Sequence, residues 1–340
     1  MNRLLSIARL LLLSLLFLGH ADAGEKNEIN MLFLGNSFTF RHNLPRLVKK
    51  VVEEGQPGVT VNTSRVVYGG QNMFKHSTYY LSQTFLEQST ITDETINDRI
   101  KQMEGFLNLK NDPQKFADYH KEVEARGTPA FSEIHKHIKK SIRDHKKLLD
   151  EDPRTKWDYI VLQSWQDVHP SLDAGYAKYA QKFAEVARKQ GTKVILYITA
   201  PKIQNSTPVT EPQLQERVDL EVKLAAALAK QIDADAVVPV PLAINMIQQG
   251  GTGLTFCYVN DGHPNQYCAF LTSNMFYAAL FKKSSEGFRY NTVTETNPKG
   301  QGEGKDPDGG NAAVVFDTKT KTYLQKMAFD AVAAFDQKLK

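Results

Sequence analysis

Three side chains in two distant stretches of the sequence have the types needed for nucleophilic catalysis. Ser37 stands in "LFLGNSFTF" (32–40), where an apolar run stops at small and polar residues. Asp261 and His263 stand two positions apart in "YVNDGHPNQYCAF" (258–270). A serine hydroxyl becomes a strong nucleophile when a histidine accepts its proton and a carboxylate orients the histidine. We therefore predict that Ser37, His263 and Asp261 act together, although a helix cap or a turn would also explain each of them.

Alternating apolar runs and amphipathic helices are expected to position these residues. Strand-like runs cover 29–34, 59–67, 159–163, 193–200 and 235–243, and helical patterns cover 44–55, 174–191, 212–232 and 266–281. This rhythm predicts an α/β fold, with a doubly wound, mostly parallel sheet between two layers of helices. Ligands bind beyond the carboxyl ends of such strands. Ser37, Gly70, Gln163 and the loop after Ala243 should therefore lie along one edge of the sheet.

Residues 75–156 interrupt this rhythm and predict a helical insertion. Its longest helical pattern carries an apolar stripe, with the basic residues on the opposite face (stripe: Phe131, Ile134, Ile138, Ile142, Leu149). We expect His135, His137 and His145 to lie on a solvent-exposed helix and not in a metal site. We expect the insertion to roof the cleft and exclude large substrates; bracing the outside of the sheet is the alternative. Residues 286–340 form a C-terminal extension, whose Gly-rich part at 296–311 is expected to be a flexible surface loop.

The first 23 residues have the pattern of a cleaved secretory signal. Arg3 and Arg9 accompany a short apolar run, and Ala21-Asp22-Ala23 suits cleavage after Ala23. A membrane anchor formed by this same segment is the alternative, although a span needs about 20 apolar residues. No later stretch of the sequence is apolar enough to span a bilayer. Removal of this segment lowers the formal charge from +4 to +3, which gives no electrostatic reason to expect nucleic acid as a partner. We predict a secreted or periplasmic protein of residues 24–340.

Three blocks of the sequence resemble the SGNH, or GDSL-type, esterase superfamily over roughly residues 29–74 and 157–285. "LFLGNSFT" is similar to the first block, "VVYGGQ" to the second and "NDGHPNQYCAFL" to the last. The resemblance implies a flavodoxin-like three-layer α/β/α sandwich that needs no metal or other cofactor. It also implies that the N–H groups of Ser37 and Gly70 bind the oxyanion.

The chain departs from the pattern of this superfamily at two places. The third block usually supplies an asparagine to the oxyanion, and this chain has "VLQSWQD" instead. An exported branch with Leu-Gln here favours Gln163 as the donor, with Gln166 as the alternative. The acid usually stands three residues before the histidine, whereas Asp261 stands two before His263. A tighter loop could still bring it to the imidazole; otherwise a backbone carbonyl would orient His263.

Cys257 and Cys268 are the only cysteines, and they bracket the acid and base. An exported chain could join them in a disulfide that restrains this loop. A pair of buried thiols is the alternative, because helix geometry could point Cys268 away.

These observations favour an exported serine esterase that removes a short acyl group, such as acetyl, from a carbohydrate. The carbohydrate follows only from export and from the resemblance. A non-catalytic exported protein that binds a glycan or small molecule on the same fold is the alternative.

Overall fold

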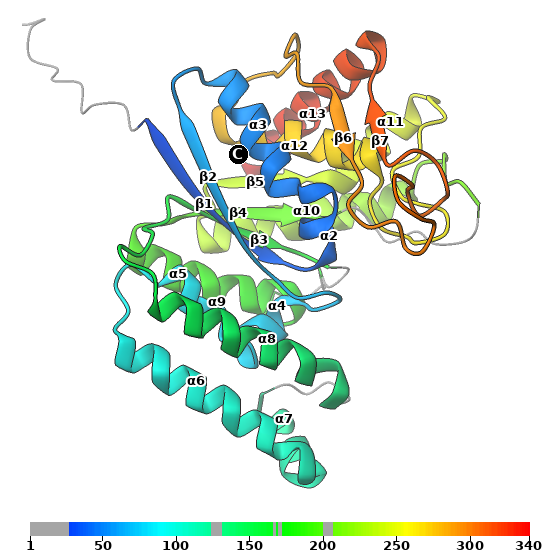
Figure 1. Cartoon of the computed structure of the whole chain (residues 1–340). Helices are drawn as coiled ribbons and strands as arrows, with labels where there is room; N and C mark the ends of the chain where they lie inside the picture. Colours follow the sequence, from blue (N-terminus) through cyan, green and yellow to red (C-terminus); the bar gives the residue numbers. More distant parts are fainter. Residues whose placement is uncertain (1–26, 124–130, 166–167, 169–171, 200–206) are drawn as a thin grey trace, which may run out of the picture.

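The computed structural model describes residues 27–123, 131–165, 168, 172–199 and 207–340, so the predicted signal segment and Gln166 lie outside it. Its centre is a five-stranded parallel sheet with the order β2-β1-β3-β4-β5 (Figure 1). The strands are β1 (Glu28–Gly35), β2 (Thr60–Val67), β3 (Tyr159–Gln163), β4 (Lys193–Ile198) and β5 (Ala236–Pro239). This order is that of flavodoxin-like doubly wound sheets. The predicted fold class is confirmed.

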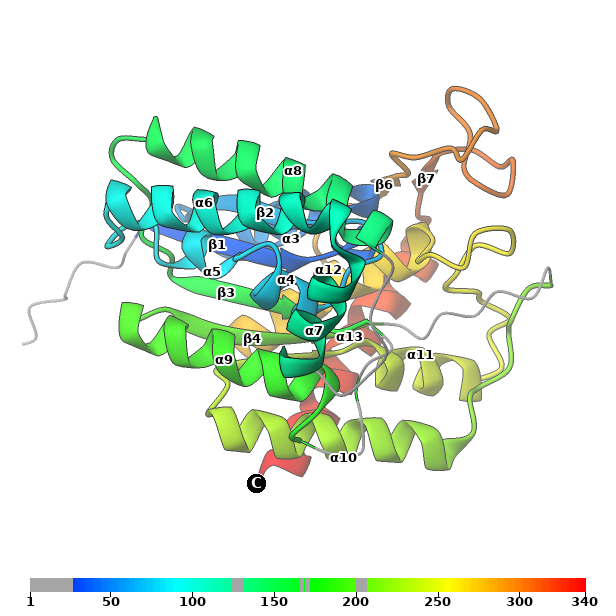
Figure 2. The ribbon, with the colours of Figure 1, turned by 90° about the horizontal axis from the view of Figure 1, so that it is seen from below.

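The strands β1, β3, β4 and β5 are largely apolar on both sides, since helices cover both faces of the sheet, whereas the edge strand β2 is mostly polar and exposed (Figure 2). In β1, Met31 and Phe33 face one layer while Leu32 and Leu34 face the other, and none is more than 1% exposed. The Met31 side packs against α3 (Leu44–Gly55), α11 (Val240–Gln249), α12 (Gln266–Phe281) and α13 (Thr318–Leu339). The Leu32 side packs against α4 (Met73–Thr78), α5 (Gln83–Leu86), α8 (Phe131–Leu149), α9 (Gly175–Gln190) and α10 (Gln215–Ile232).

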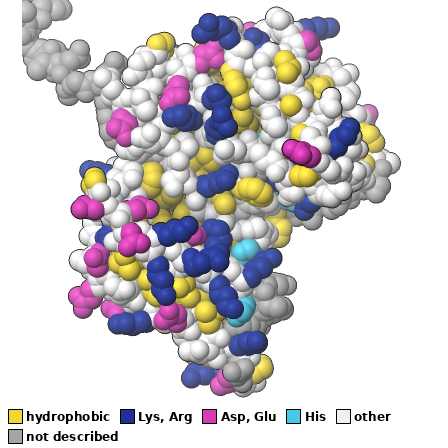
Figure 3. Space-filling view, viewed as in Figure 1, with side chains coloured by type: hydrophobic (Ala, Val, Ile, Leu, Met, Phe, Trp, Pro, Cys, Tyr) yellow, Lys and Arg dark blue, Asp and Glu magenta, His cyan; other side chains and the backbone are white. Residues whose placement is uncertain are grey.

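The insertion between β2 and β3 braces the sheet. Ile134, Ile138 and Ile142 of α8 belong to the same core as the strands. The helices α6 (Asp93–Asn108) and α7 (Pro113–Val123) lie further from the sheet and join this core through buried apolar side chains (Ile96, Ile100, Met103, Phe106 and Phe116). The basic side chains of α8 point to solvent and form a patch in Figure 3. The expectation for two histidines of this helix is wrong, because His137 is 9% exposed and His145 is fully buried.

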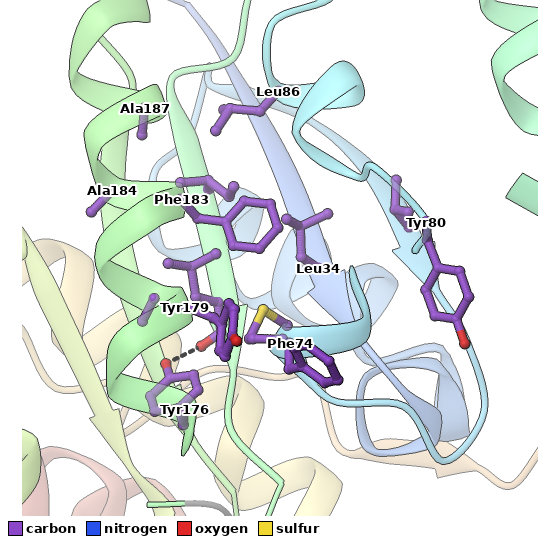
Figure 4. Close-up of a cluster of buried hydrophobic side chains, with 14 of the residues drawn as sticks. Leu34, Phe74, Tyr80, Leu86, Tyr176, Tyr179, Phe183, Ala184 and Ala187 are labelled. Atoms are coloured by element: carbon purple, nitrogen blue, oxygen red, sulfur yellow. Dashed lines mark hydrogen bonds between the residues drawn. The ribbon is translucent and has the colours of Figure 1, made fainter. Parts of the chain in front are cut away.

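Aromatic packing anchors the short helix α4, which begins just after Gly69-Gly70. Phe74 of α4 lies against Tyr179 of α9, with ring centroids 5.3 Å apart, near Leu34 at the end of β1 (Figure 4). Tyr176 of α9 donates a hydrogen bond of 2.6 Å to the carbonyl of Leu162 in β3. The loop before α4 is therefore held at its end by a helix that is packed into the core.

The last predicted strand is shorter than expected. β5 ends at Pro239, and α11 begins at Val240 with Pro241 in its first turn. Proline suits the first turn of a helix, where no amide hydrogen is needed for the backbone ladder. The loop that follows this part of the chain thus begins after Gln249 and not after Ala243.

The C-terminal extension adds a two-stranded antiparallel sheet, β6 (Thr292–Thr294) and β7 (Ala313–Val315), followed by α13. The long loop between β6 and β7 lies beside the loop that precedes α12, at the carboxyl end of the parallel strands (Figure 1). The carboxylate of Asp308 accepts hydrogen bonds from the N–H groups of Val259 and Asn260, at 2.9 and 2.8 Å. The expected flexible loop is therefore bonded to the loop that carries the predicted acid and base. Among the described residues, no helix has the length and hydropathy to cross a membrane.

Candidate active site

The end of β1 has room only for glycine at position 35. A Cβ atom there would lie 2.2 Å from Oε1 of Gln163 and 2.6 Å from Oγ1 of Thr39. Asn36, the next residue, is 1% exposed. Because both residues face the interior, the small side chains serve the packing of β1 against β3.

Gln163 is fully used in holding this strand end together. Its Oε1 accepts hydrogen bonds from the N–H of Asn36 at 2.8 Å and from Oγ1 of Thr39 at 2.6 Å. Its Nε2 donates to Oδ1 of Asn36 at 2.8 Å and to the carbonyl of Ser164 at 3.0 Å. An amide nitrogen has only two hydrogens, so Gln163 has none left for an oxyanion. The structure therefore contradicts the predicted oxyanion role of Gln163 and places this side chain beneath the nucleophile as a support.

Ser37, His263 and Asp261 lie together in the structure. Nε2 of His263 is 2.8 Å from Oγ of Ser37, and Nδ1 of His263 is 3.0 Å from Oδ1 of Asp261. Ser37 opens the short helix α2 (Ser37–Phe40), and the side chain of Asn36 caps that helix by accepting from the N–H of Phe38 at 3.0 Å. A donor, a ring and a carboxylate in this order form the chain of contacts that activates a serine hydroxyl.

A tight loop before α12 brings Asp261 within reach of His263 despite the short spacing. The N–H of Tyr258 donates to the carbonyl of His263 at 2.9 Å, and the N–H of Gly262 donates to the carbonyl of Tyr258 at 3.0 Å. Gly262 has a φ of 65°, which glycine adopts without strain. The turn at Gly262 therefore points the neighbouring acid and base toward each other.

Arg41 was not predicted as a site residue, yet it contacts the acid directly. Its Nη1 donates to Oδ2 of Asp261 at 2.5 Å. Burial alone would raise the pKa of Asp261, but hydrogen bonds from His263 and Arg41 outweigh it and hold the pKa well below its usual value. Asp261 is therefore a carboxylate throughout the neutral pH range.

The loop from Tyr68 to Gln71 is tied to the strand end below Ser37. The N–H of Tyr68 donates to the carbonyl of Gly35 at 3.1 Å, and Nδ2 of Asn36 donates to the carbonyl of Gln71 at 2.9 Å. Between these bonds Gly70 is exposed, with a φ of 68° and open space where a Cβ would stand. Within the described residues, neither its N–H nor that of Ser37 donates to the protein. Both are available to a ligand.

Cys257 and Cys268 are not bridged, so the predicted disulfide is absent. Cys268 lies on the inner face of α12 and is 1% exposed, with Sγ 4.0 Å from Oγ1 of Thr272. Burial raises the pKa of this thiol well above its usual value. Backbone bonds, not a covalent link, hold the loop that carries Asp261 and His263. In the described part of the chain, no group of three His, Cys, Asp or Glu side chains is placed to hold a metal ion.

Comparison with known proteins gives only distant structural similarity. No protein-family model matches the chain, and neither does the sequence of any curated protein. The structure is similar to a DUF4886 family protein from Bacteroides uniformis, with 16% identity, a TM-score of 0.47 and coverage of 90% of this chain and 95% of that one. It is also similar to a candidate SGNH hydrolase from Slackia heliotrinireducens (14% identity, TM-score 0.38, coverage 74% and 97%). A gut microbial diltiazem-metabolizing enzyme is a third (11% identity, TM-score 0.36, coverage 76% and 48%). Because these identities and TM-scores are low, the function is inferred from the geometry of the site.

Proposed function

We propose that this protein is a serine hydrolase of the SGNH type that cleaves carboxylic esters. The observation that carries the proposal is the unbroken contact from Oγ of Ser37 through the imidazole of His263 to the carboxylate of Asp261, at 2.8 and 3.0 Å. The resemblance of the sequence blocks around Ser37, Gly70 and His263 to the SGNH superfamily supports the same function.

In the proposed reaction, Oγ of Ser37 attacks the ester carbonyl carbon while its proton passes to Nε2 of His263. The tetrahedral intermediate collapses, and His263 returns that proton to the oxygen of the leaving alcohol. Water then attacks the acyl-serine and gives a proton to His263, which passes it back to Ser37 as the carboxylic acid leaves. Asp261 stabilises the imidazolium in both halves.

The N–H groups of Ser37 and Gly70 are the proposed oxyanion donors. Neither N–H donates a hydrogen bond to a protein acceptor among the described residues, and donors aimed at developing charge are often the largest single contribution to such catalysis. Gln166, the alternative side-chain donor, lies outside the described residues.

We further propose that the substrate carries a short acyl group, such as acetyl, on a carbohydrate, and that the protein acts after export. Both parts rest on the signal-like segment at 1–23 and on the family resemblance. Sequencing the N-terminus of the protein released from the producing cell tests export: a chain that starts at Gly24 supports it, and a chain that keeps residues 1–23 contradicts it.

A non-catalytic binding protein on the same fold is a second candidate. The observation that favours it is the internal use of both N–H groups of Gln163, which removes the expected side-chain donor to the oxyanion. A binding protein would bind acylated glycans without releasing the acid.

Turnover of p-nitrophenyl acetate and of a panel of acetylated glycans separates the two candidates. Replacing Ser37 by alanine should lower kcat by about 10⁴- to 10⁶-fold, as removal of a serine nucleophile does elsewhere, and should abolish labelling by a fluorophosphonate probe. Ser64→Ala, an exposed serine of β2, is the matched control and should behave as wild type. Glycan binding with neither turnover nor labelling would favour the second candidate.

A further inference from the structure

Arg41 is a buried arginine between two carboxylates. Its side chain is 1% exposed and lies 5.6 Å from the centre of the Tyr258 ring. Nε donates to both oxygens of Glu295, at 2.9 and 3.1 Å, and Nη2 donates to Oε2 at 2.6 Å. The remaining nitrogen, Nη1, reaches Asp261. One guanidinium plane thus joins the proposed catalytic acid to a residue 34 positions further along the chain.

Glu295 is itself fixed at the point where β6 ends. Its side chain is fully buried, and Oε1 accepts hydrogen bonds from the N–H groups of Thr296 and Asn297, at 2.7 and 2.8 Å. Burial alone would raise the pKa of Glu295, but the hydrogen bond and charge of Arg41, together with the N–H of Asn297, outweigh it and lower this pKa. Glu295 is therefore a rigid, ionised partner that sets the direction of the guanidinium.

We propose that Arg41, oriented by Glu295, is the positioning residue that aims Asp261 at His263, so that the C-terminal extension completes the active site. This inference rests on the proposed esterase function. The two oxygens of Asp261 have separate partners: Oδ1 faces His263 and Oδ2 is bonded to Arg41. Without the second bond the carboxylate can rotate away from the imidazole. Lysine cannot replace the planar fork that bonds two carboxylates at once.

Charge gives the cluster a second effect on the reaction. Asp261 faces Arg41, His263 and, at 3.5 Å, the half-exposed Lys299; Glu295 faces Arg41 and His42. Burial lowers the pKa of His42, so that ring is neutral near pH 7. Two carboxylates therefore share one buried arginine, and the imidazolium formed during the reaction adds the second positive charge. Removing the charge of Arg41 strengthens the hold on that proton, whereas removing the charge of Glu295 weakens it.

The test compares Arg41→Gln, Arg41→Lys and Glu295→Gln in the mature chain, with kcat counted per fluorophosphonate-labelled site and followed from pH 5 to 9. All three should lose about 10- to 100-fold in kcat with little change in KM, because small displacements of reacting groups are costly. The acid limb of the profile should move up by about one pH unit in Arg41→Gln and down in Glu295→Gln, and stay in place in Arg41→Lys. Arg65→Gln is the matched control: Arg65 bonds the carbonyl of Phe40 at 3.4 Å and touches neither carboxylate.

Titration of the His263 ring by NMR in isotopically labelled protein reads the same effect without any substrate. Opposite displacements of its midpoint in Arg41→Gln and Glu295→Gln support the inference even if the wild type hydrolyses no ester, in which case only the proposed function fails. Wild-type kcat per labelled site together with an unmoved midpoint in folded Arg41→Gln would overturn it. If Arg41→Gln does not fold, the same two readings on Glu295→Gln decide.

Discussion

Two groups of buried polar side chains lie on opposite sides of the sheet and solve the problem of burial differently. The histidine cluster, made of His76, His137 and His145, lies on the side of the insertion. The ionic cluster, made of Arg41, Glu295 and Asp261, lies at the carboxyl edge on the other side. The first has mostly neutral partners and the second has opposite charges. Partners, and not depth, decide whether a buried group keeps its charge.

The bonds of the histidine cluster illustrate this. His76 lies 2.9 Å from Oγ of Ser82 and 2.8 Å from the carbonyl of Gly35, and burial lowers its pKa to about 3. His145 lies 2.8 Å from the carbonyl of Ser141 and 2.8 Å from Oγ1 of Thr84, and burial lowers its pKa to about 4. These rings are neutral at pH 7. They connect the insertion to the core and, through Gly35, to the strand end below Ser37.

The largest effect is expected from breaking the ionic cluster. Arg41→Met leaves Glu295 and Asp261 buried without their shared positive charge, and such a loss typically costs about 3 to 5 kcal/mol in the free energy of unfolding. Urea denaturation at pH 7 measures it. Arg65→Met removes an exposed arginine and should change the free energy of unfolding by less than about 1 kcal/mol. Equal stability of Arg41→Met and wild type would show that the cluster contributes no net stability.

An intermediate effect is expected from pH at the histidine cluster. Because the folded pKa of His76 is lowered from 6.5 to about 3, the unfolded chain binds the additional proton between these values. The free energy of unfolding is unaffected by this proton well above pH 6.5. It decreases as the pH falls below 6.5, and at pH 5 the decrease due to His76 is about 2 kcal/mol. His76→Asn should therefore lose less stability than wild type between pH 8 and pH 5, by that amount.

His135→Asn serves as the control for this measurement, because His135 lies on α8, the helix of His137 and His145, but is only half-buried. It should follow the wild-type curve closely. The ionic cluster should contribute little to this window: the pKa values of Asp261 and Glu295 are lowered in the folded chain, so the stability they add is lost only where the unfolded carboxyl groups bind protons, which is mainly below about pH 5. Parallel curves for wild type and His76→Asn would contradict the assignment of a neutral buried ring.

The smallest effect is expected from Lys299, the half-exposed member next to the ionic cluster. Its Nζ lies 3.5 Å from Oδ1 of Asp261, and 46% of its side chain is exposed. Solvent screens such a pair, so Lys299→Ala should change the free energy of unfolding by no more than about 1 kcal/mol. A loss as large as that of Arg41→Met would show that the distinction between buried and exposed charges does not hold here.

Much of the fold was predictable because its signals are local. The buried strands β1 and β3 stood out as apolar runs between turn residues, and Ser37 follows β1 as expected. Asp261 and His263 stood out by residue type, but their loop follows helix α11 and not a strand. The two buried histidines of α8 were also within reach of the sequence. His137 and His145 each follow an isoleucine of the apolar stripe by three positions, which places them beside that stripe on the same helix face.

Other parts of the site had no local signal. Arg41 and Glu295 are separated by 254 positions, and neither stands in a periodic pattern, so only the folded chain reveals their contact. The role expected for Gln163 came from a family resemblance, and it failed because the adjacent Asn36 and Thr39 take up the amide group. A residue type at the right strand end does not reveal which way its hydrogen bonds point.

The contact between Arg41 and Glu295 also has a consequence for timing during biosynthesis. A ribosome makes Ser37 early, whereas Glu295 and Asp308 come near the end of the 340-residue chain. A nascent chain that stops before Glu295 contains the proposed nucleophile, base and acid but lacks the carboxylate that orients Arg41. If the protein is exported N-terminus first, as we propose, the same order holds during translocation. If the proposed esterase function holds, activity would then begin only after Glu295 had emerged.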